Sequence, residues 1–116
     1  MMKIERGNIV LIKSYGHGHI QNGIRPHLVL QNNIGNKFSP TTITAPLTSE
    51  LKKVDLPTHE IVSINDAIGL KCDSMVLCEQ ITTIDKNDII KIVGKITNEI
   101  VMTKIAKACS ISLALN

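Results

Sequence analysis

Short runs of β-branched and other apolar residues, separated by polar and glycine-containing stretches, dominate the first two thirds of the chain. This pattern is typical of β-strands joined by turns and loops. It predicts five strands, at residues 8–13, 27–32, 41–47, 59–64 and 73–84. Pro26 precedes the second strand, where a missing amide donor is tolerated. The fifth is long enough to run through the centre of a sheet.

The periodicity becomes helical near the C-terminus, where apolar residues recur every three or four positions. A helix is predicted over 98–114, with Thr97 as its N-cap. Its apolar face comprises Val101, Ile105, Ala108 and Leu115. A shorter helical piece is predicted over 85–92, with Asp85 able to cap it. Strands followed by helices indicate an α+β fold, a small bent antiparallel sheet or partial barrel with helical cover.

The length and composition narrow the class of protein. A chain of 116 residues holds one domain, which we place at 1–116. The sequence contains neither an apolar stretch near 18 residues nor a secretory signal, so we expect a cytoplasmic protein without a membrane partner. Cys72, Cys78 and Cys109 lack paired metal-ligand spacing, and we interpret them as small buried hydrophobes. The formal charge of +3 is compatible with nucleic acid but does not by itself indicate it.

Five segments carry a resemblance to a known family: "RGNIVLI", "GIRPHLVLQNNIGNKFSPTTITAPLTS", "LPTH", "DSMVLCEQITTIDK" and "ISLAL". They occur in order over nearly the whole chain and resemble the MazF/PemK toxins, sequence-specific endoribonucleases of type II toxin–antitoxin systems. The resemblance implies an SH3-like or CcdB-like β-barrel with a C-terminal α-helix, assembled as a homodimer. It further implies metal-independent and cofactor-free cleavage of single-stranded mRNA, leaving 2′,3′-cyclic phosphate and 5′-hydroxyl ends, and inhibition by a cognate antitoxin protein.

The resemblance assigns catalytic roles to Arg25 in "GIRP" and Thr48 in "PLTS". A permanently charged, bidentate guanidinium is suited to the charge that grows on phosphoryl oxygens in the transition state. Pro26 restricts the backbone of the arginine and aims it. Without the resemblance, Arg25 would be interpreted as a surface ion pair and Thr48 as an ordinary turn residue.

The loop before Arg25 departs from the family pattern. Many members carry "SEQGG" there, whereas this chain has "HIQNG", so Ile20 stands where an acidic residue is expected. His19 is the nearest group whose free pKa suits proton transfer near neutrality, and we consider it a candidate catalytic residue. The alternative is that His17 and His19 are solvated loop residues. A His-x-His metal site lacks a third ligand nearby.

Loops are predicted at 14–24 and 33–40, and the candidate RNA contacts are polar or aromatic residues within them: Tyr15, His17, Gln21, Asn22, Lys37 and Phe38. Aromatic rings can stack unpaired bases, although Phe38 could equally fill the core. Thr82 stands where related toxins often have an arginine, so a phosphate contact is lost there if that side chain faces RNA. Lys13, Lys52 and Lys53, like Lys37, either compensate electrostatically or are solvated surface residues, and His27 and His59 are interpreted as structural.

These residues together predict an mRNA interferase. Two alternatives remain open. Ile20 and Thr82 allow a catalytically weakened toxin-like module that only binds RNA or antitoxin. A CcdB-like gyrase poison is the second, but that activity relies on a C-terminal Trp-Gly-Ile, and this chain has no tryptophan and ends in "LALN".

Overall fold

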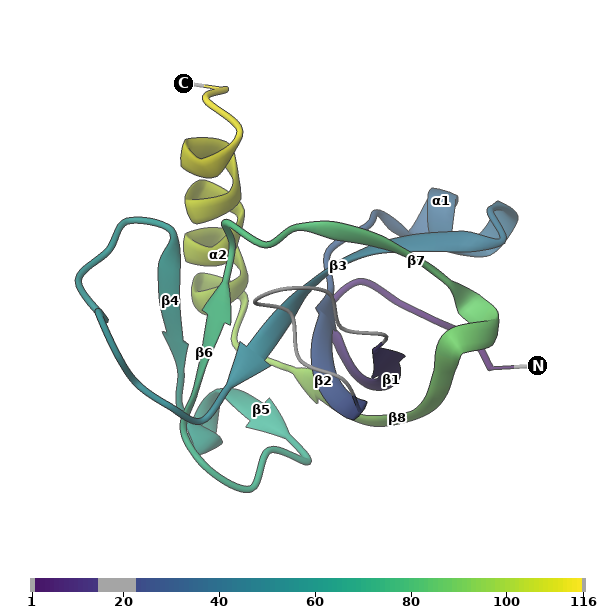
Figure 1. Ribbon diagram of the computed structural model, residues 1–116, viewed down its shortest axis with the longest axis horizontal. Helices are drawn as coiled ribbons and strands as arrows, with labels where there is room; N and C mark the ends of the chain where they lie inside the picture. The colour runs from purple at the N-terminus through teal and green to yellow at the C-terminus, as the bar shows by residue number, and fades with distance from the viewer. Residues whose placement is uncertain (1, 15–22, 116) are drawn as a thin grey trace.

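The computed structural model describes residues 2–14 and 23–115, apart from the side chain of Ser14, and shows a strongly bent antiparallel sheet with one long helix at its side (Figure 1). Within the described residues the strands are β1 (Asn8–Ser14), β2 (Gly23–Val29), β3 (Thr41–Thr48), β4 (His59–Val62), β5 (Ala67–Ile68), β6 (Ser74–Leu77), β7 (Thr82–Asp85) and β8 (Ile89–Ile96). The helices are α1 (Asn33–Phe38) and α2 (Glu99–Ser112), with 3-10 turns η1 (Ile64–Asp66) and η2 (Lys86–Asp88).

β3 is the hub of the sheet. The strands follow the order β4-β6-β3-β2-β1-β8-β5, and β7 adds to β3 beside its pairing with β6. All pairings are antiparallel. The sheet curls into a nearly closed barrel, which confirms the α+β barrel predicted from the sequence.

Both faces of the curled sheet carry buried apolar residues, because successive side chains of a strand point to opposite faces. On one face, Val101, Ile105 and Ala108 of α2 pack over a cluster that includes Ile9 of β1. Its neighbour Val10 belongs to a second cluster on the other face, together with Ile4, Ile12, Val29 and Ile89. The buried positions predicted for the C-terminal helix are therefore confirmed, except that Leu115 lies beyond α2 and is 71% exposed.

The second strand and the loop after it differ from the prediction. β2 begins at Gly23 and ends at Val29, so Pro26 lies inside it rather than at its start. At Pro26 the strand pairs with β1 alone, because its pairing with β3 begins only at His27. The missing amide of Pro26 therefore removes no hydrogen bond to β3. The segment predicted as a loop forms α1, whose N-cap Asn32 accepts a hydrogen bond from the Gly35 amide at 2.8 Å.

The fifth predicted strand is broken. Residues 73–84 form β6 and β7, separated by a turn in which the Gln80 amide donates to the Leu77 carbonyl oxygen at 3.0 Å. Both halves nevertheless pair with β3, β6 near its end and β7 near its start. The apolar pattern predicted the strand character, and the turn between the two halves was missed.

The helical piece predicted over 85–92 is wrong beyond its first turn. Asp85 does act as a cap, but only for η2, and the β-branched run that follows forms β8 against β1. The two-residue strand β5 was not predicted.

The N-cap of α2 is Asn98, whose side chain accepts from the Ile100 amide at 3.0 Å, while the backbone amide of Thr97 donates to the Asp66 carbonyl oxygen.

The cysteines divide by environment. Cys78 is fully buried and Cys109 is half-buried, as small hydrophobic residues would be, but Cys72 is exposed and that interpretation is wrong for it. Across the described part of the chain, every helix is too short or too polar to cross a membrane.

Candidate active site

Arg25 and Thr48, assigned from sequence segments 23 positions apart, lie on neighbouring strands. The pairing of the two strands ends at His27 and Pro46, two residues after Arg25 and two residues before Thr48. Both residues also line one cavity of about 460 Å³. The structure therefore brings the two predicted catalytic residues together.

The wall of this cavity contains two further cations. Lys91 lies on β8 opposite Leu11 of β1, and Lys71 lies in the segment between β5 and β6. Both line the cavity that Arg25 and Thr48 line. Sequence reasoning missed Lys91 because residues 85–92 were assigned to a helix, and it missed Lys71 because that residue lies between two predicted strands. Reading 89–96 as a strand would have placed Lys91 in the sheet, but only the strand order brings β8 near the cavity.

The Thr48 hydroxyl is oriented by its own turn. The Glu50 amide donates a hydrogen bond to Thr48 Oγ1 at 3.1 Å. A threonine hydroxyl can donate one hydrogen bond and can accept others through its lone pairs, and here the Glu50 amide occupies one lone pair of the Thr48 oxygen. The O–H group is thus left to donate to a ligand in the cavity.

His27 is the nearest described histidine to Arg25 along the chain and is 7% exposed. Its Nδ1 lies 2.9 Å from Thr44 Oγ1. Burial, together with the guanidinium of Arg25, lowers the pKa of His27 to about 4. The ring is therefore neutral near pH 7, so no second positive charge is placed beside Arg25. The structural role predicted for His27 is confirmed.

His59 holds the connector that follows Thr48. Its Nδ1 donates to the Lys53 carbonyl oxygen at 3.0 Å, and its Nε2 lies 2.7 Å from Glu79 Oε2. The ring is largely buried, with 8% of its side chain exposed. These contacts tie the 49–58 connector to the turn after β6, which confirms the structural role predicted for His59.

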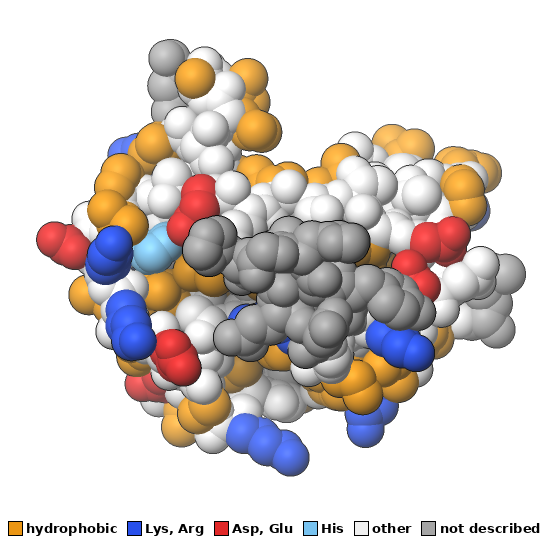
Figure 2. Space-filling view, in the orientation of Figure 1, with side chains coloured by type: hydrophobic (Ala, Val, Ile, Leu, Met, Phe, Trp, Pro, Cys, Tyr) orange, Lys and Arg blue, Asp and Glu red, His pale blue; other side chains and the backbone are white. Residues whose placement is uncertain are grey.

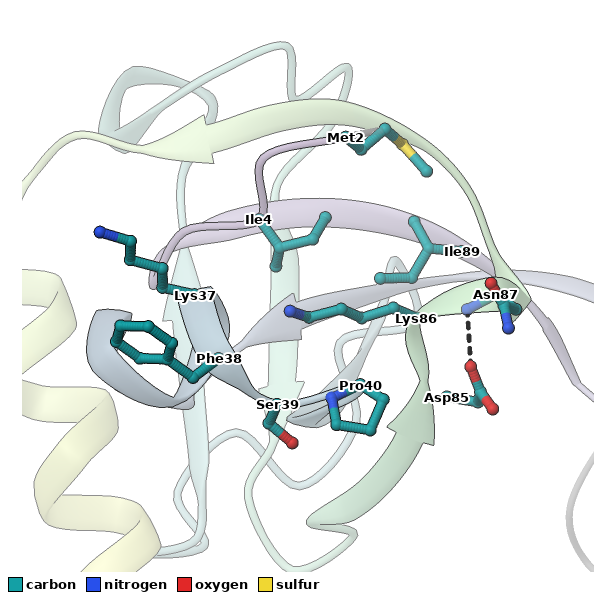
Figure 3. A pocket seen from close by; sticks show the side chains of 10 residues that line it. All are labelled: Met2, Ile4, Lys37, Phe38, Ser39, Pro40, Asp85, Lys86, Asn87 and Ile89. Atoms are coloured by element: carbon teal, nitrogen blue, oxygen red, sulfur yellow. Dashed lines mark hydrogen bonds between the residues drawn. The ribbon is translucent and has the colours of Figure 1, made fainter.

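Lys37 and Phe38 lie elsewhere. They line a separate hollow of about 610 Å³, formed by α1, the N-terminal segment and η2 (Figure 3). α1 precedes the start of β3 whereas Thr48 ends it, so at ~3.3 Å per residue the two regions are roughly 20 Å apart. Lys37 Nζ lies 5.3 Å from the centre of the Phe38 ring. Phe38 is 76% exposed, which excludes the core-filling alternative.

The other predicted site residues belong to the segment 15–22. Tyr15, His17, His19, Gln21 and Asn22 are outside the described residues, as is Ile20. The face shown in Figure 2 carries basic and acidic side chains interspersed rather than a single basic patch. Lys52, for instance, lies 3.7 Å from Glu50 in an exposed ion pair. Local placement of charge around the cavity therefore matters more than the overall charge.

The sequence matches a known protein family and curated relatives over nearly its whole length. Residues 5–113 match the family described as PemK-like, MazF-like toxin of type II toxin–antitoxin system. Endoribonuclease EndoA of Bacillus subtilis (strain 168) is 43% identical over 98% of this chain and 97% of its own length. Endoribonuclease MazF of Staphylococcus epidermidis is 39% identical over 97% and 93%, respectively.

Solved structures show the same fold. MazF of Deinococcus radiodurans superposes with a TM-score of 0.80 at 20% identity, covering 98% of this chain and 99% of that one. An endoribonuclease in complex with its cognate antitoxin, from a mycobacterial species, has a TM-score of 0.78 at 24% identity, covering 97% of each chain. From the extent of the family match and the identity to the two curated relatives, this chain belongs to the PemK-like, MazF-like toxins of type II toxin–antitoxin systems.

Proposed function

We propose that the protein is an endoribonuclease that cleaves single-stranded mRNA at a short specific sequence and slows growth when its antitoxin is degraded. The family membership and the relatives named endoribonuclease support the activity. The observation that carries the proposal for the site is that Arg25 and Thr48 line one cavity. This chain has both the arginine and the hydroxyl donor that RNA cleavage by these toxins requires, Arg25 and Thr48. Their presence favours an active enzyme over a weakened binding module.

The reaction is an attack of the RNA 2′-hydroxyl on the adjacent phosphorus. The bond from phosphorus to the 5′-oxygen breaks, which leaves a 2′,3′-cyclic phosphate and a 5′-hydroxyl end. The guanidinium of Arg25 stabilises the charge that grows on the phosphoryl oxygens. The O–H group of Thr48, whose oxygen is held by the Glu50 amide, donates to a second phosphoryl oxygen or to the leaving 5′-oxygen.

Lys71 and Lys91 bind the phosphates that flank the scissile one. Each is a cation on the wall of the same cavity, and a single-stranded substrate presents a negative charge at every nucleotide. Lysine acts on phosphate as a point charge, whereas the fork of Arg25 can bind two oxygens of the reacting group. The two lysines therefore contribute to binding, and Arg25 contributes to the chemical step.

Proton transfer is assigned to His19. An arginine guanidinium keeps its proton in proteins, so Arg25 supplies charge rather than a base. The two histidines that the structure describes are both engaged, His27 with Thr44 and His59 with Lys53 and Glu79. Tyr15, His17, Gln21 and Asn22 of the same loop contact the RNA bases and backbone, and Lys37 and Phe38 contact a more distant part of the strand.

The protein acts in the cytoplasm as a homodimer, and an antitoxin with an acidic, disordered tail covers the RNA groove. The relative solved in complex with its cognate antitoxin supports such a partner. Competition between a cognate antitoxin fragment and RNA for the groove tests this assignment directly.

The test of the function is incubation of pure protein with a long single-stranded RNA in the presence of EDTA, followed by analysis of the new ends. We expect cleavage at one short sequence, with 5′-hydroxyl ends. Binding without cleavage would support the weakened module instead. Products with 5′-phosphate ends, or activity abolished by EDTA, would indicate metal-dependent chemistry and contradict the proposal.

A further inference from the structure

Two cysteines that are 31 positions apart in the chain meet at the junction between the barrel and α2. Cys78 directly follows β6, and its backbone amide donates to the Thr58 carbonyl oxygen at 2.9 Å. Cys109 lies in the third turn of α2. The Cys78 thiol donates toward the Ile105 carbonyl oxygen, at 3.9 Å, one helical turn before Cys109. The Cys78 sulfur is thus directed at the part of the helix that carries the second thiol.

Cys109 also packs against the buried cluster that contains Cys78. A hydrogen bond between the two thiols lowers the pKa of Cys109 to about 7, and the nearby guanidinium of Arg6 contributes to this. The same hydrogen bond and burial raise the pKa of Cys78. The thiolate is the reactive form of cysteine, so Cys109 is the nucleophile of the pair and Cys78 is its protonated partner.

Of the two thiols, only that of Cys109 is accessible from solution. Cys78 is fully buried. Cys109 is half-buried and lines a hollow of about 210 Å³ whose other walls include Arg6, Ile43 and Leu113. Ile43 is 38% and Leu113 56% exposed, so reagents in solution reach this hollow. A small thiol reagent therefore meets the sulfur of Cys109 first and that of Cys78 only through Cys109.

We infer that Cys109 and Cys78 are an oxidisable pair that a small-molecule disulfide converts into an intramolecular disulfide, joining α2 to the end of β6. The Cys109 thiolate attacks one sulfur of the reagent, the reagent's S–S bond breaks, and one thiolate leaves and takes up a proton from water. Cys78 then attacks the Cys109 sulfur of the mixed disulfide, and its thiol proton goes with the second departing thiol. Two protein thiols are oxidised and one reagent disulfide is reduced to two thiols.

The consequence for the fold is a covalent link across the core. The new bond would close a loop of about 30 residues that contains β7, β8 and most of α2. Closing a loop of that length restricts the unfolded chain and raises the midpoint of thermal unfolding by roughly 10 °C for a domain of this size. Cys72 is not part of this pair, since it is exposed and lines the cavity of Arg25 instead.

The experiment uses the full chain carrying Cys72→Ser, incubated with oxidised glutathione and analysed by intact mass, peptide mapping without reductant and thermal unfolding. We expect the mass to fall by two hydrogen atoms, a linked peptide containing both cysteines, and a higher midpoint that dithiothreitol reverses. Adding Cys78→Ala should instead trap glutathione on Cys109, and adding Cys109→Ala should leave the protein unreacted.

A parent protein that keeps both thiols, or that carries glutathione on Cys109 without forming the linked peptide, would overturn the inference. Both results are read from the parent protein, so they stand even if the Cys78→Ala variant fails to fold. RNA cleavage is not part of the readout, so the outcome is independent of the proposed function.

Discussion

Arg25 carries a permanent positive charge on a rigid part of the barrel backbone. It lies in β2 opposite Ile12, a buried residue, and is followed by Pro26. The backbone that carries the guanidinium is therefore held by the sheet on one side and by a fixed proline dihedral on the other. Thr48 is held by the end of β3 and by the Glu50 amide. Such preorganised donors lose little when charge develops in a transition state.

Removal of either donor should therefore affect the chemical step. We expect Arg25→Ala and Thr48→Ala each to lower the single-turnover cleavage rate by at least ~100-fold, with unchanged unfolding midpoints. Thr48→Ser keeps the hydroxyl and should retain most of the rate, whereas Arg25→Lys keeps the charge but loses the bidentate fork and should not. Near-normal cleavage by Arg25→Ala would refute the proposed mechanism.

Lys91 should act differently from Arg25. We expect Lys91→Ala to weaken RNA binding several-fold and to reduce the slope of log affinity against log salt by ~0.7, the value for one phosphate contact on a single strand. The single-turnover rate at saturating RNA should change little. Lys107→Ala is the matched control, because Lys107 is exposed on α2 and is not among the residues that line the cavity. Equal salt slopes for Lys91→Ala and Lys107→Ala would exclude the contact.

The burial of His27 links stability to pH. Its pKa is about 4 in the folded protein, below the ordinary value of 6.5, so the unfolded chain takes up a proton that the folded chain excludes. The stabilisation is complete above pH 6.5 and is lost as the pH falls toward 4, by up to about 3 kcal/mol. Urea unfolding of the parent and of His27→Gln across this range should show a steeper pH dependence in the parent. Parallel curves would contradict the assignment.

At the scale of elements, β5 approaches β8 unusually closely. Gly69 directly follows β5 with φ +82, and a Cβ there would lie 2.1 Å from the Val93 carbonyl oxygen. We expect Gly69→Ala to lower the free energy of unfolding by about 2 kcal/mol or more, measured by urea denaturation. Gly23→Ala is the matched control, since Gly23 also has a positive φ but a Cβ there meets no atom of the described residues within 4 Å. If the two variants were equally destabilised, backbone strain alone would explain the loss.

The elements that could be predicted from sequence are those with a strong local pattern. β1, β3, β4 and α2 have apolar periodicity over their whole length, and their positions agree closely with the prediction. The errors arose where a sequence pattern correctly indicated a local feature that extends over only a few residues. Asp85 caps a single 3-10 turn, after which the pairing of β8 with β1 decides the conformation. The break between β6 and β7 likewise depends on contacts with β3 and the 49–58 connector, which no local pattern encodes.

Less of the candidate site than of the fold could be predicted from the sequence. Arg25 and Thr48 were identified only through the family resemblance, since either residue alone would be read as an ordinary surface or turn residue. That the two residues line one cavity then follows from the structure. Lys71 and Lys91 could not be assigned, because their proximity to Arg25 depends on the order of strands in the sheet.

At the scale of the whole molecule, the cavity joins two parts of the sheet that differ in how firmly they are held. One side is built on β3, which pairs with β2, β6 and β7. The other side includes Gly69 to Cys72, which follow β5, a two-residue strand paired only with β8 among the described strands. Thr48 thus comes from β3, which has three partner strands, and Arg25 comes from its neighbour β2, whereas Lys71 comes from a segment beside the two-residue strand β5.

The central position of β3 has a consequence for local opening. Thr44 is fully buried and pairs with Val29 on one side and Thr82 on the other, so its backbone reaches solvent only when the sheet comes apart. In native-state hydrogen exchange we expect buried β3 amides to report the global free energy of unfolding, and amides of residues 67–72 to exchange through a much smaller opening. Equal protection in both segments would contradict this. A long RNA strand could then enter by displacing the weakly held wall, while Arg25 and Thr48 stay in place.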